Sequence, residues 1–87
     1  MIIGIVLDSI WCTRKDDSLT GVKLMMVRLL DKENKNDSDI IVAADIIGAG
    51  VGEKVLITQG SSARKSVGFD KSPIDATIVG IIDDKAV

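Results

Sequence analysis

The sequence predicts an all-β fold: a small, five-stranded, OB-like closed barrel with at most one short helix, in a single domain over residues 1–87. Three observations predict it. Five short segments are rich in β-branched residues and alternate with polar or glycine-containing turns. Only one segment carries a helix start signal, and a glycine and a proline soon after it keep the helix short. Closing five short strands into a barrel removes the edges that an open sheet would expose.

The first expected strand, 2–12, is largely apolar on both faces, with Trp11 on one face and Cys12 on the other. We therefore expect both faces to be covered. Cys12 is expected to be a buried small hydrophobe. A reactive thiol is not predicted, because the chain contains no histidine that would activate it.

The second expected strand, 22–30, lies between polar loops at 13–21 and 31–39. Its two methionines, Met25 and Met26, are expected to fill the core, because methionine adapts to irregular gaps. The loop at 31–39 gathers carboxylates, but it lacks the ordered D-x-D-x-D-G spacing and the glutamate at the twelfth position of a calcium-binding loop. Both loops are therefore interpreted as solvated turns.

The second half of the chain supplies the remaining strands, expected at 40–43, 54–58 and 77–82. In the connection 60–75, Ser61 or Ser62 is expected to N-cap a short helical turn through Ala63 and Arg64. Gly80, inside the last strand, indicates a bend or a close backbone approach.

The stretch 43–64 organises the chain, because Gly48, Gly50 and Gly52 occupy every second position within it. This spacing favours positive φ angles or the close approach of another backbone, so we expect a phosphate, a loop or a subunit to fill the adjoining space. A phosphate is disfavoured. Glu53 separates the last glycine from the lysine that a P-loop requires, and the G-x-G-x-G spacing precedes a strand instead of a helix.

Length and composition predict an oligomer. A domain of 87 residues buries only roughly 60% of its unfolded surface and is marginally stable alone. The single cysteine excludes an internal disulfide, and the lack of histidine argues against a zinc site. Association between copies is the remaining support, and a mean hydropathy of +0.30 is consistent with an apolar interface.

Charge and segment lengths argue against several function classes. A formal net charge of −2, one Trp and one Phe supply neither the basic groove nor the stacking aromatics of a nucleic-acid-binding barrel. No apolar run approaches the roughly 20 residues that span a bilayer, and the apolar N-terminal stretch lacks the flanks of a signal peptide. We therefore expect a cytoplasmic protein without nucleic-acid or membrane partners. No nucleophile has a candidate base, so no enzyme activity, catalytic residue, cofactor or metal site is predicted.

Short motifs follow one another along nearly the whole chain: Gly21, Lys23-Leu24, Val27, Leu30-Asp31, Ala44-Asp45, Gly48-Ala49-Gly50, Gly52-Glu53, Val55-Leu56, Gly60-Ser61-Ser62-Ala63-Arg64, Pro73-Ile74-Asp75-Ala76 and Ile78-Val79-Gly80-Ile81-Ile82-Asp83. This ordered set resembles the EutN/CcmL family, the small vertex proteins of bacterial microcompartment shells. The resemblance implies an OB-like barrel whose homopentamers form truncated pyramids where flat sheets of hexameric shell proteins meet. It predicts a structural protein that caps the vertices of the shell and supplies curvature.

The expected subunit interface or axial region comprises Gly48, Ala49, Gly50, Val51, Gly52, Glu53, Gly60, Ser61, Ser62, Ala63 and Arg64. Two interpretations of Arg64 remain open: a guanidinium held near the backbone and paired with Asp45 or Asp75, or a solvated surface arginine. The alternative function is an OB-like ligand-binding or nucleic-acid-binding module. Sequence physics predicts a ring without choosing its subunit number, and the resemblance chooses five.

Overall fold

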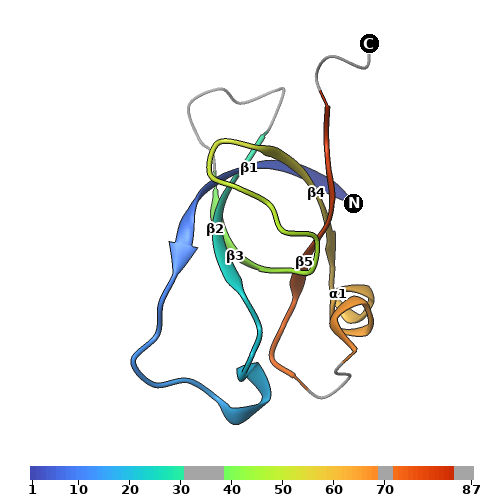
Figure 1. Cartoon of the computed structure of the whole chain (residues 1–87). Coiled ribbons are helices and arrows are strands. Elements are labelled where there is room, and N and C mark those ends of the chain that lie inside the picture. Colours follow the sequence, from blue (N-terminus) through green and yellow to red (C-terminus); the bar gives the residue numbers. More distant parts are fainter. Residues whose placement is uncertain (31–38, 69–71, 84–87) are drawn as a thin grey trace.

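The computed structural model describes residues 1–30, 39–68 and 72–83. Five strands close a barrel in the order β1-β2-β3-β5-β4 (Figure 1). One α-helix and one 3-10 turn are also described, and the bounds are β1 Ile2–Ile10, η1 Asp17–Leu19, β2 Leu24–Leu29, β3 Ile40–Asp45, β4 Lys54–Gln59, α1 Ser61–Val67 and β5 Ala76–Ile81. The predicted all-β barrel with one short helix is confirmed. The polar loop expected at 31–39 lies outside the described residues, apart from Asp39.

The pairing of the strands explains where the connections run. β1, β2 and β3 form an antiparallel meander, and β4 pairs antiparallel with both β1 and β5. A short parallel contact between β3 and β5 closes the barrel, with Ala44 opposite Thr77 and Asp45 opposite Ile78. Because β5 lies between β3 and β4, the connection 46–53 cannot be a tight hairpin. It crosses one mouth of the barrel (Figure 1).

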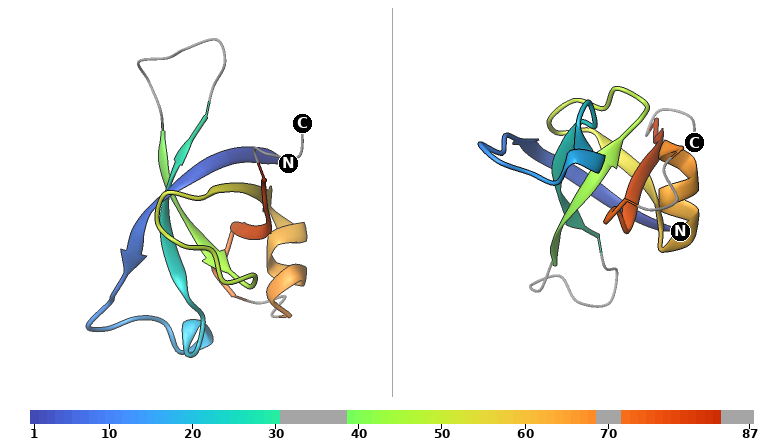
Figure 2. Two further views of the ribbon diagram at one scale, coloured as in Figure 1. Left: turned by 45° about the horizontal axis from the view of Figure 1, so that its top comes forward. Right: turned by 90° about the horizontal axis from the view of Figure 1, so that it is seen from below.

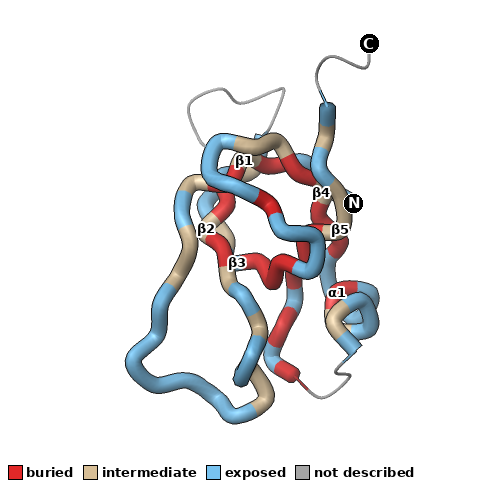
Figure 3. Tube along the Cα trace, viewed as in Figure 1, coloured by how far each residue is buried: buried red, intermediate tan, exposed pale blue. Residues whose placement is uncertain are grey.

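Alternate strand residues point into the barrel and form its core, as the period of two in a strand requires. Figure 3 shows the buried positions along the inner side of the strands and on the connection that crosses the mouth. Met25 is 2% exposed, whereas Met26 faces outward and is half-buried, so the core-filling prediction is confirmed for Met25 only. The buried cluster comprises Val6, Met25, Val27, Ala43, Ala49, Val55, Ile57, Ala76 and Ile78.

Gly4 is the position where the barrel requires a glycine, and the sequence analysis did not single it out. It lies in the first half of β1 and pairs with Leu29 of β2 and with Val55 of β4. A Cβ atom at this position would overlap a methyl group of Val27 and would lie 2.9 Å from the carbonyl oxygen of Arg28. Real Cβ atoms do not approach backbone that closely, so β1 and β2 meet here without an intervening side chain.

Two irregularities bend the strands. The register between β1 and β2 shifts between Val6 and Asp8, and the register between β4 and β5 shifts between Leu56 and Ile57. Gly80 is opposite Leu56, next to the second shift, which agrees with the bend predicted inside β5.

The end of β1 differs from the prediction. Pairing with β2 stops at Ile10 opposite Leu24, and the segment 11–23 then projects beyond the barrel (Figure 2). Trp11 is 91% exposed and Cys12 is exposed, so the expectation that Cys12 is a buried core residue was wrong. The prediction placed the end of the strand too late because the sequence alternates like a strand beyond Ile10, the last residue of β1 that pairs with β2.

The helix α1 begins one residue earlier than a serine cap would require. Gly60, with φ of +67°, is the N-cap, and no side chain caps the helix, so the prediction that Ser61 or Ser62 is the N-cap was wrong. The helix ends at Gly68 in the left-handed conformation, as expected. Its buried Ala63 packs with Ala44 and Ile74, and the buried hydroxyl of Thr77 donates to the carbonyl of Ala63 at 2.8 Å.

The segment 11–23 is tied back to the barrel at its far end. Asp16 caps η1: the hydroxyl and the backbone N–H of Ser18 both donate to its carboxylate, and the hydroxyl bond in particular lowers the pKa of Asp16. Leu19 and Val22 then pack against the small cluster around Ala63. Among the described residues, no helix has the length and apolar character needed to cross a membrane.

Candidate assembly site at the glycine-rich loop

The connection 46–53, which we call the glycine-rich loop, is held by one buried carboxylate. The side chain of Asp45 has no exposed surface. One of its oxygens accepts hydrogen bonds from the backbone N–H groups of Ile47 and Gly48, at 2.9 and 3.0 Å, and the other accepts from Ala49 at 2.8 Å. Three hydrogen bonds from successive N–H groups to a charged acceptor fix the first half of the loop.

The second half of the loop is held by its own backbone and by β1. Gly52 donates to the carbonyl of Val6 at 2.8 Å, and Val6 donates to the carbonyl of Glu53 at 3.0 Å. Positive φ angles at Gly48 and Gly52, +90° and +87°, allow the chain to turn twice within five residues. The loop is therefore ordered by contacts within one chain before any partner binds.

The glycine-rich loop has apolar residues on both its buried and its exposed side. Ala49 is 2% exposed and belongs to the core, where it covers the mouth of the barrel. Ile46, Ile47 and Val51 face outward and are 47%, 46% and 66% exposed. An ordered loop with an apolar outer side suits contact with another protein surface.

Lys23 adds a charge partner, but the hydrogen bonds dominate. Its ammonium nitrogen lies 3.6 Å from Asp45, and the lysine side chain is 53% exposed. Ion pairs that reach solvent contribute about 0–1 kcal/mol, whereas each hydrogen bond to a charged group contributes about 1.5–3 kcal/mol. The backbone N–H groups therefore account for most of the stabilisation at Asp45.

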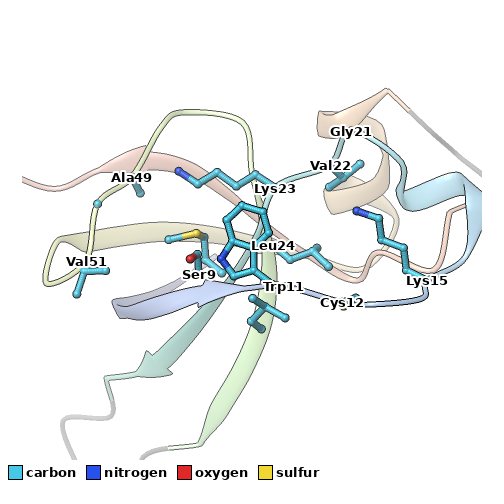
Figure 4. Close-up of a pocket in the computed structure, with 13 residues that line it drawn as sticks. Ser9, Trp11, Cys12, Lys15, Gly21, Val22, Lys23, Leu24, Ala49 and Val51 are labelled. Atoms are coloured by element: carbon cyan, nitrogen blue, oxygen red, sulfur yellow. The ribbon is translucent and has the colours of Figure 1, made fainter.

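Beside the loop lies a hollow of about 440 Å³ between the end of β1, the start of β2 and the loop tip (Figure 4). Among the described residues, its charged side chains are Lys15 and Lys23, and no carboxylate lines it. Cys12 and Ser9 also lie on its wall. Among residues 1–30, 39–68 and 72–83, no group of three or more His, Cys, Asp or Glu side chains gathers to hold a metal. The hollow thus offers a surface for docking, lined by apolar side chains and two lysines.

Comparison with known proteins gives the family. The family described as "Ethanolamine utilisation protein EutN/carboxysome" matches residues 1–83. The chain belongs to the EutN/CcmL family. It is 45% identical to the bacterial microcompartment shell vertex protein GrpN of Rhodospirillum rubrum, over 95% of this chain and 93% of that one. It is 46% identical to the carboxysome shell vertex protein CcmL of a Synechocystis species, over 90% of this chain and 78% of that one.

Solved structures of EutN/CcmL members have the same fold. CcmL of Gloeobacter violaceus superposes with a TM-score of 0.85 at 41% identity, over 95% of this chain and 86% of that one. The pentameric microcompartment shell protein GrpN from Rhodospirillum rubrum gives a TM-score of 0.81 at 42% identity, over 95% of this chain and 94% of that one.

The structure separates the two parts of the site predicted for this EutN/CcmL member. Residues 48–53 precede β4 and line one mouth of the barrel, whereas residues 60–64 follow β4 and form the start of α1. Ser61 and Ser62 are exposed, and Ala63 is fully buried. The two segments therefore present separate surfaces, and only the first borders the hollow.

Arg64 is close to the backbone, as one of the two interpretations expected. Its guanidinium donates to the carbonyl oxygen of Ile74 at 3.4 Å. Within the described part of the chain, Asp45 pairs with Lys23, and no ion pair joins Arg64 to Asp45 or Asp75. The pairing predicted for Arg64 is thus not made within the subunit. The role of Asp45 was not predicted from the sequence, although Asp with Gly three residues later is a usual signal for a carboxylate that accepts from the turn that follows it.

Replacing Gly50 by valine is expected to destabilise the protein by about 1 kcal/mol. A Cβ at this position would lie 3.1 Å from Glu53 Oε1, which accepts a 2.6 Å hydrogen bond from the N–H of Gly50. The crowding atom belongs to a side chain, so the prediction that another backbone approaches Gly50 is not met within the chain. The main loss is therefore the hydrogen bond, and chemical denaturation measures it.

A Glu53→Ala background provides the control. If displacement of Glu53 is the whole cost, Gly50→Val should add little in that background, as a double-mutant cycle reveals. An unchanged cost in both backgrounds would show instead that Gly50 is crowded by a neighbouring molecule.

Proposed function

We propose that this chain is a structural shell protein of a bacterial microcompartment that forms homopentamers at the vertices of the polyhedral shell. The observation that carries the proposal is the match to GrpN, a pentameric microcompartment shell protein, over 95% of this chain at 42% identity and a TM-score of 0.81. By name, GrpN is a bacterial microcompartment shell vertex protein and the Synechocystis relative CcmL is a carboxysome shell vertex protein, so the element that they share is the shell vertex.

The proposed mechanism is geometric. A sheet of six-fold units is flat, and it closes into a polyhedron only if five-fold units occupy its corners. A ring of five rigid barrels caps the corner, supplies the curvature and seals the opening, so hexameric shell proteins are the partners we propose. Rigidity is supported by the closed barrel and by the anchored glycine-rich loop.

We further propose that residues 48–53 lie at a contact between subunits and that the chain has no enzymatic activity. The apolar outer side of the loop supports the first statement. For the second, the described residues that line the hollow beside the loop include lysines but no acid or histidine that would complete a catalytic set. A nucleic-acid-binding role has less support, because this hollow offers one Trp and two lysines instead of a basic groove with several stacking aromatics.

Native mass spectrometry at micromolar protomer concentration tests the oligomeric state, and a homopentamer is expected. Co-expression with hexameric shell proteins tests the vertex role: closed polyhedral shells should form with this chain, and open sheets or tubes without it. A stable monomer or dimer would refute the ring. A hexamer would refute the vertex role, because a six-fold unit adds no curvature.

A further inference from the structure

The segment 11–23 carries an exposed side chain, Trp11, which we call the anchor. Trp11 is 91% exposed, just beyond the last paired residue of β1. Figure 4 shows its indole among the side chains that line the hollow, which include Lys15 and Lys23. A Trp side chain buries about 150–250 Å² when it is covered, and it is among the residues that most often dominate protein interfaces. An indole presented in this way suits insertion into a partner.

A second, separate groove of about 140 Å³ lies at the outward face of β3 and adjoins the hollow, because Leu24 lines both. Its floor contains the buried residues Ala44, Ile74 and Ala76, and Val42 on its wall is 48% exposed. Drug-sized ligands occupy pockets of about 300–1,000 Å³. This groove is smaller and largely apolar, so its size suits one large apolar side chain.

We propose that Trp11 of one subunit docks into the β3 groove of the next subunit around the ring. The inference rests on the proposed pentamer and names the contact that closes it. The anchor and the groove are different surfaces of the same chain, so the contact is head-to-tail, which is the type that generates rings. The indole of Trp11 in one subunit would fill the groove of the next subunit. The rim of that groove would then lie against the hollow beside Trp11 in the first subunit.

Charge at the two surfaces favours the same pairing. Among the residues that the structure describes, Lys15 and Lys23 line the hollow beside Trp11, and no carboxylate does. Of the same described residues, Asp75 lines the groove, and no lysine or arginine does. Docking the anchor into the groove brings opposite charges together at the edge of the contact, whereas two anchors facing each other would bring lysines together.

Two variants test the contact from its two sides. Trp11→Ala removes the anchor, and Val42→Lys places a charge on the groove wall that would meet the incoming indole and lysine. Both residues are exposed in the single chain, so folding should be retained, which circular dichroism checks. Each variant should shift the pentamer to monomers. The protomer concentration at which half of the pentamer has dissociated should be roughly 30-fold higher, or more, for each variant than for the wild type. Ile40→Lys is the matched control: Ile40 is 55% exposed on the same face of β3, two residues from Val42, and does not line the groove.

Mixing the two variants gives the sharpest result. The Val42→Lys chain keeps its anchor and the Trp11→Ala chain keeps its groove, so one intact contact remains possible between them. An equimolar mixture should give a one-to-one dimer by native mass spectrometry, which neither variant forms alone. The proposal is overturned if either variant remains a pentamer like the wild type, if Ile40→Lys dissociates the ring as strongly as Val42→Lys, or if the mixture contains no mixed dimer. A wild-type protein that is not a pentamer would refute the proposed function itself.

Discussion

Gly4→Ala is expected to destabilise the barrel by about 3 kcal/mol, near the upper end of the range for overpacked cores. The added Cβ would overlap Val27 and would lie 2.9 Å from the carbonyl oxygen of Arg28. A side chain alone could rotate away, but this carbonyl belongs to β2, so β1 and β2 would have to separate. The midpoint of chemical denaturation, at one fixed protomer concentration because of the expected association, measures the loss.

Gly80→Ala is the matched control for this prediction. Gly80 also lies inside a strand, and a Cβ there would find its nearest neighbour, Leu56 Cβ, at 3.7 Å, which is ordinary contact. Alanine should be neutral or stabilising by about 0.5–1 kcal/mol at this position, because it loses less chain entropy than glycine on folding. Equal effects of the two substitutions would contradict the close packing assigned to Gly4.

Asp45→Asn is expected to destabilise the protein by about 1–3 kcal/mol and to loosen the glycine-rich loop. The asparagine carbonyl oxygen can still accept from Ile47 and Gly48. Its amide NH₂, however, would face the buried N–H of Ala49, which now donates to the second carboxylate oxygen at 2.8 Å. Two donors then oppose each other in a buried place. Denaturation measures the stability, and faster amide hydrogen exchange at Ala49 reports the loop.

Asp8→Asn removes the same charge at a different kind of position. Asp8 accepts a 2.8 Å hydrogen bond from the N–H of Ser9, but the bond is exposed and water can replace it. A change within about 0.5 kcal/mol is expected. If both asparagine variants have small effects and the exchange at Ala49 is unaltered, the loop does not depend on Asp45.

The sequence was sufficient for the strands because their signals are local. Runs of β-branched residues and the turns between them placed all five strands, although β3 continues two residues further, to Asp45, than the predicted end at Ala43. Those two residues pair with β5, which is distant in the sequence, and so the local pattern did not contain them. The error at Trp11 and Cys12 also arises because pairing is not a local property. The sequence keeps the alternation of a strand through these two residues, but the pairing of β1 with β2 ends at Ile10.

The candidate site was predicted less well, because it depends on which groups meet in three dimensions. The glycines at 48 and 52 could be recognised from their spacing. The local signal for Asp45, a glycine three residues later, indicates a turn but does not show that the carboxylate is buried and accepts three hydrogen bonds. Gly4 resembles any glycine in an apolar run, and only the approach of β2 shows its importance. Gly60 replaced a serine as the N-cap because it adopts a positive φ of +67° where the chain turns into α1.

The two register pairs between β3 and β5 also bear on how the chain folds. Together with the pairing of β1 and β4, they join two parts that form from neighbouring segments: the β1–β2–β3 meander and the unit of β4, α1 and β5. Contacts between distant segments form slowly, because the entropy of closing a long loop is lost before they form. The meeting of these two parts should therefore limit the folding rate. The glycine-rich loop is the tether that sets their effective concentration, so its anchoring by Asp45 influences how fast the barrel closes as well as how firmly it stays closed.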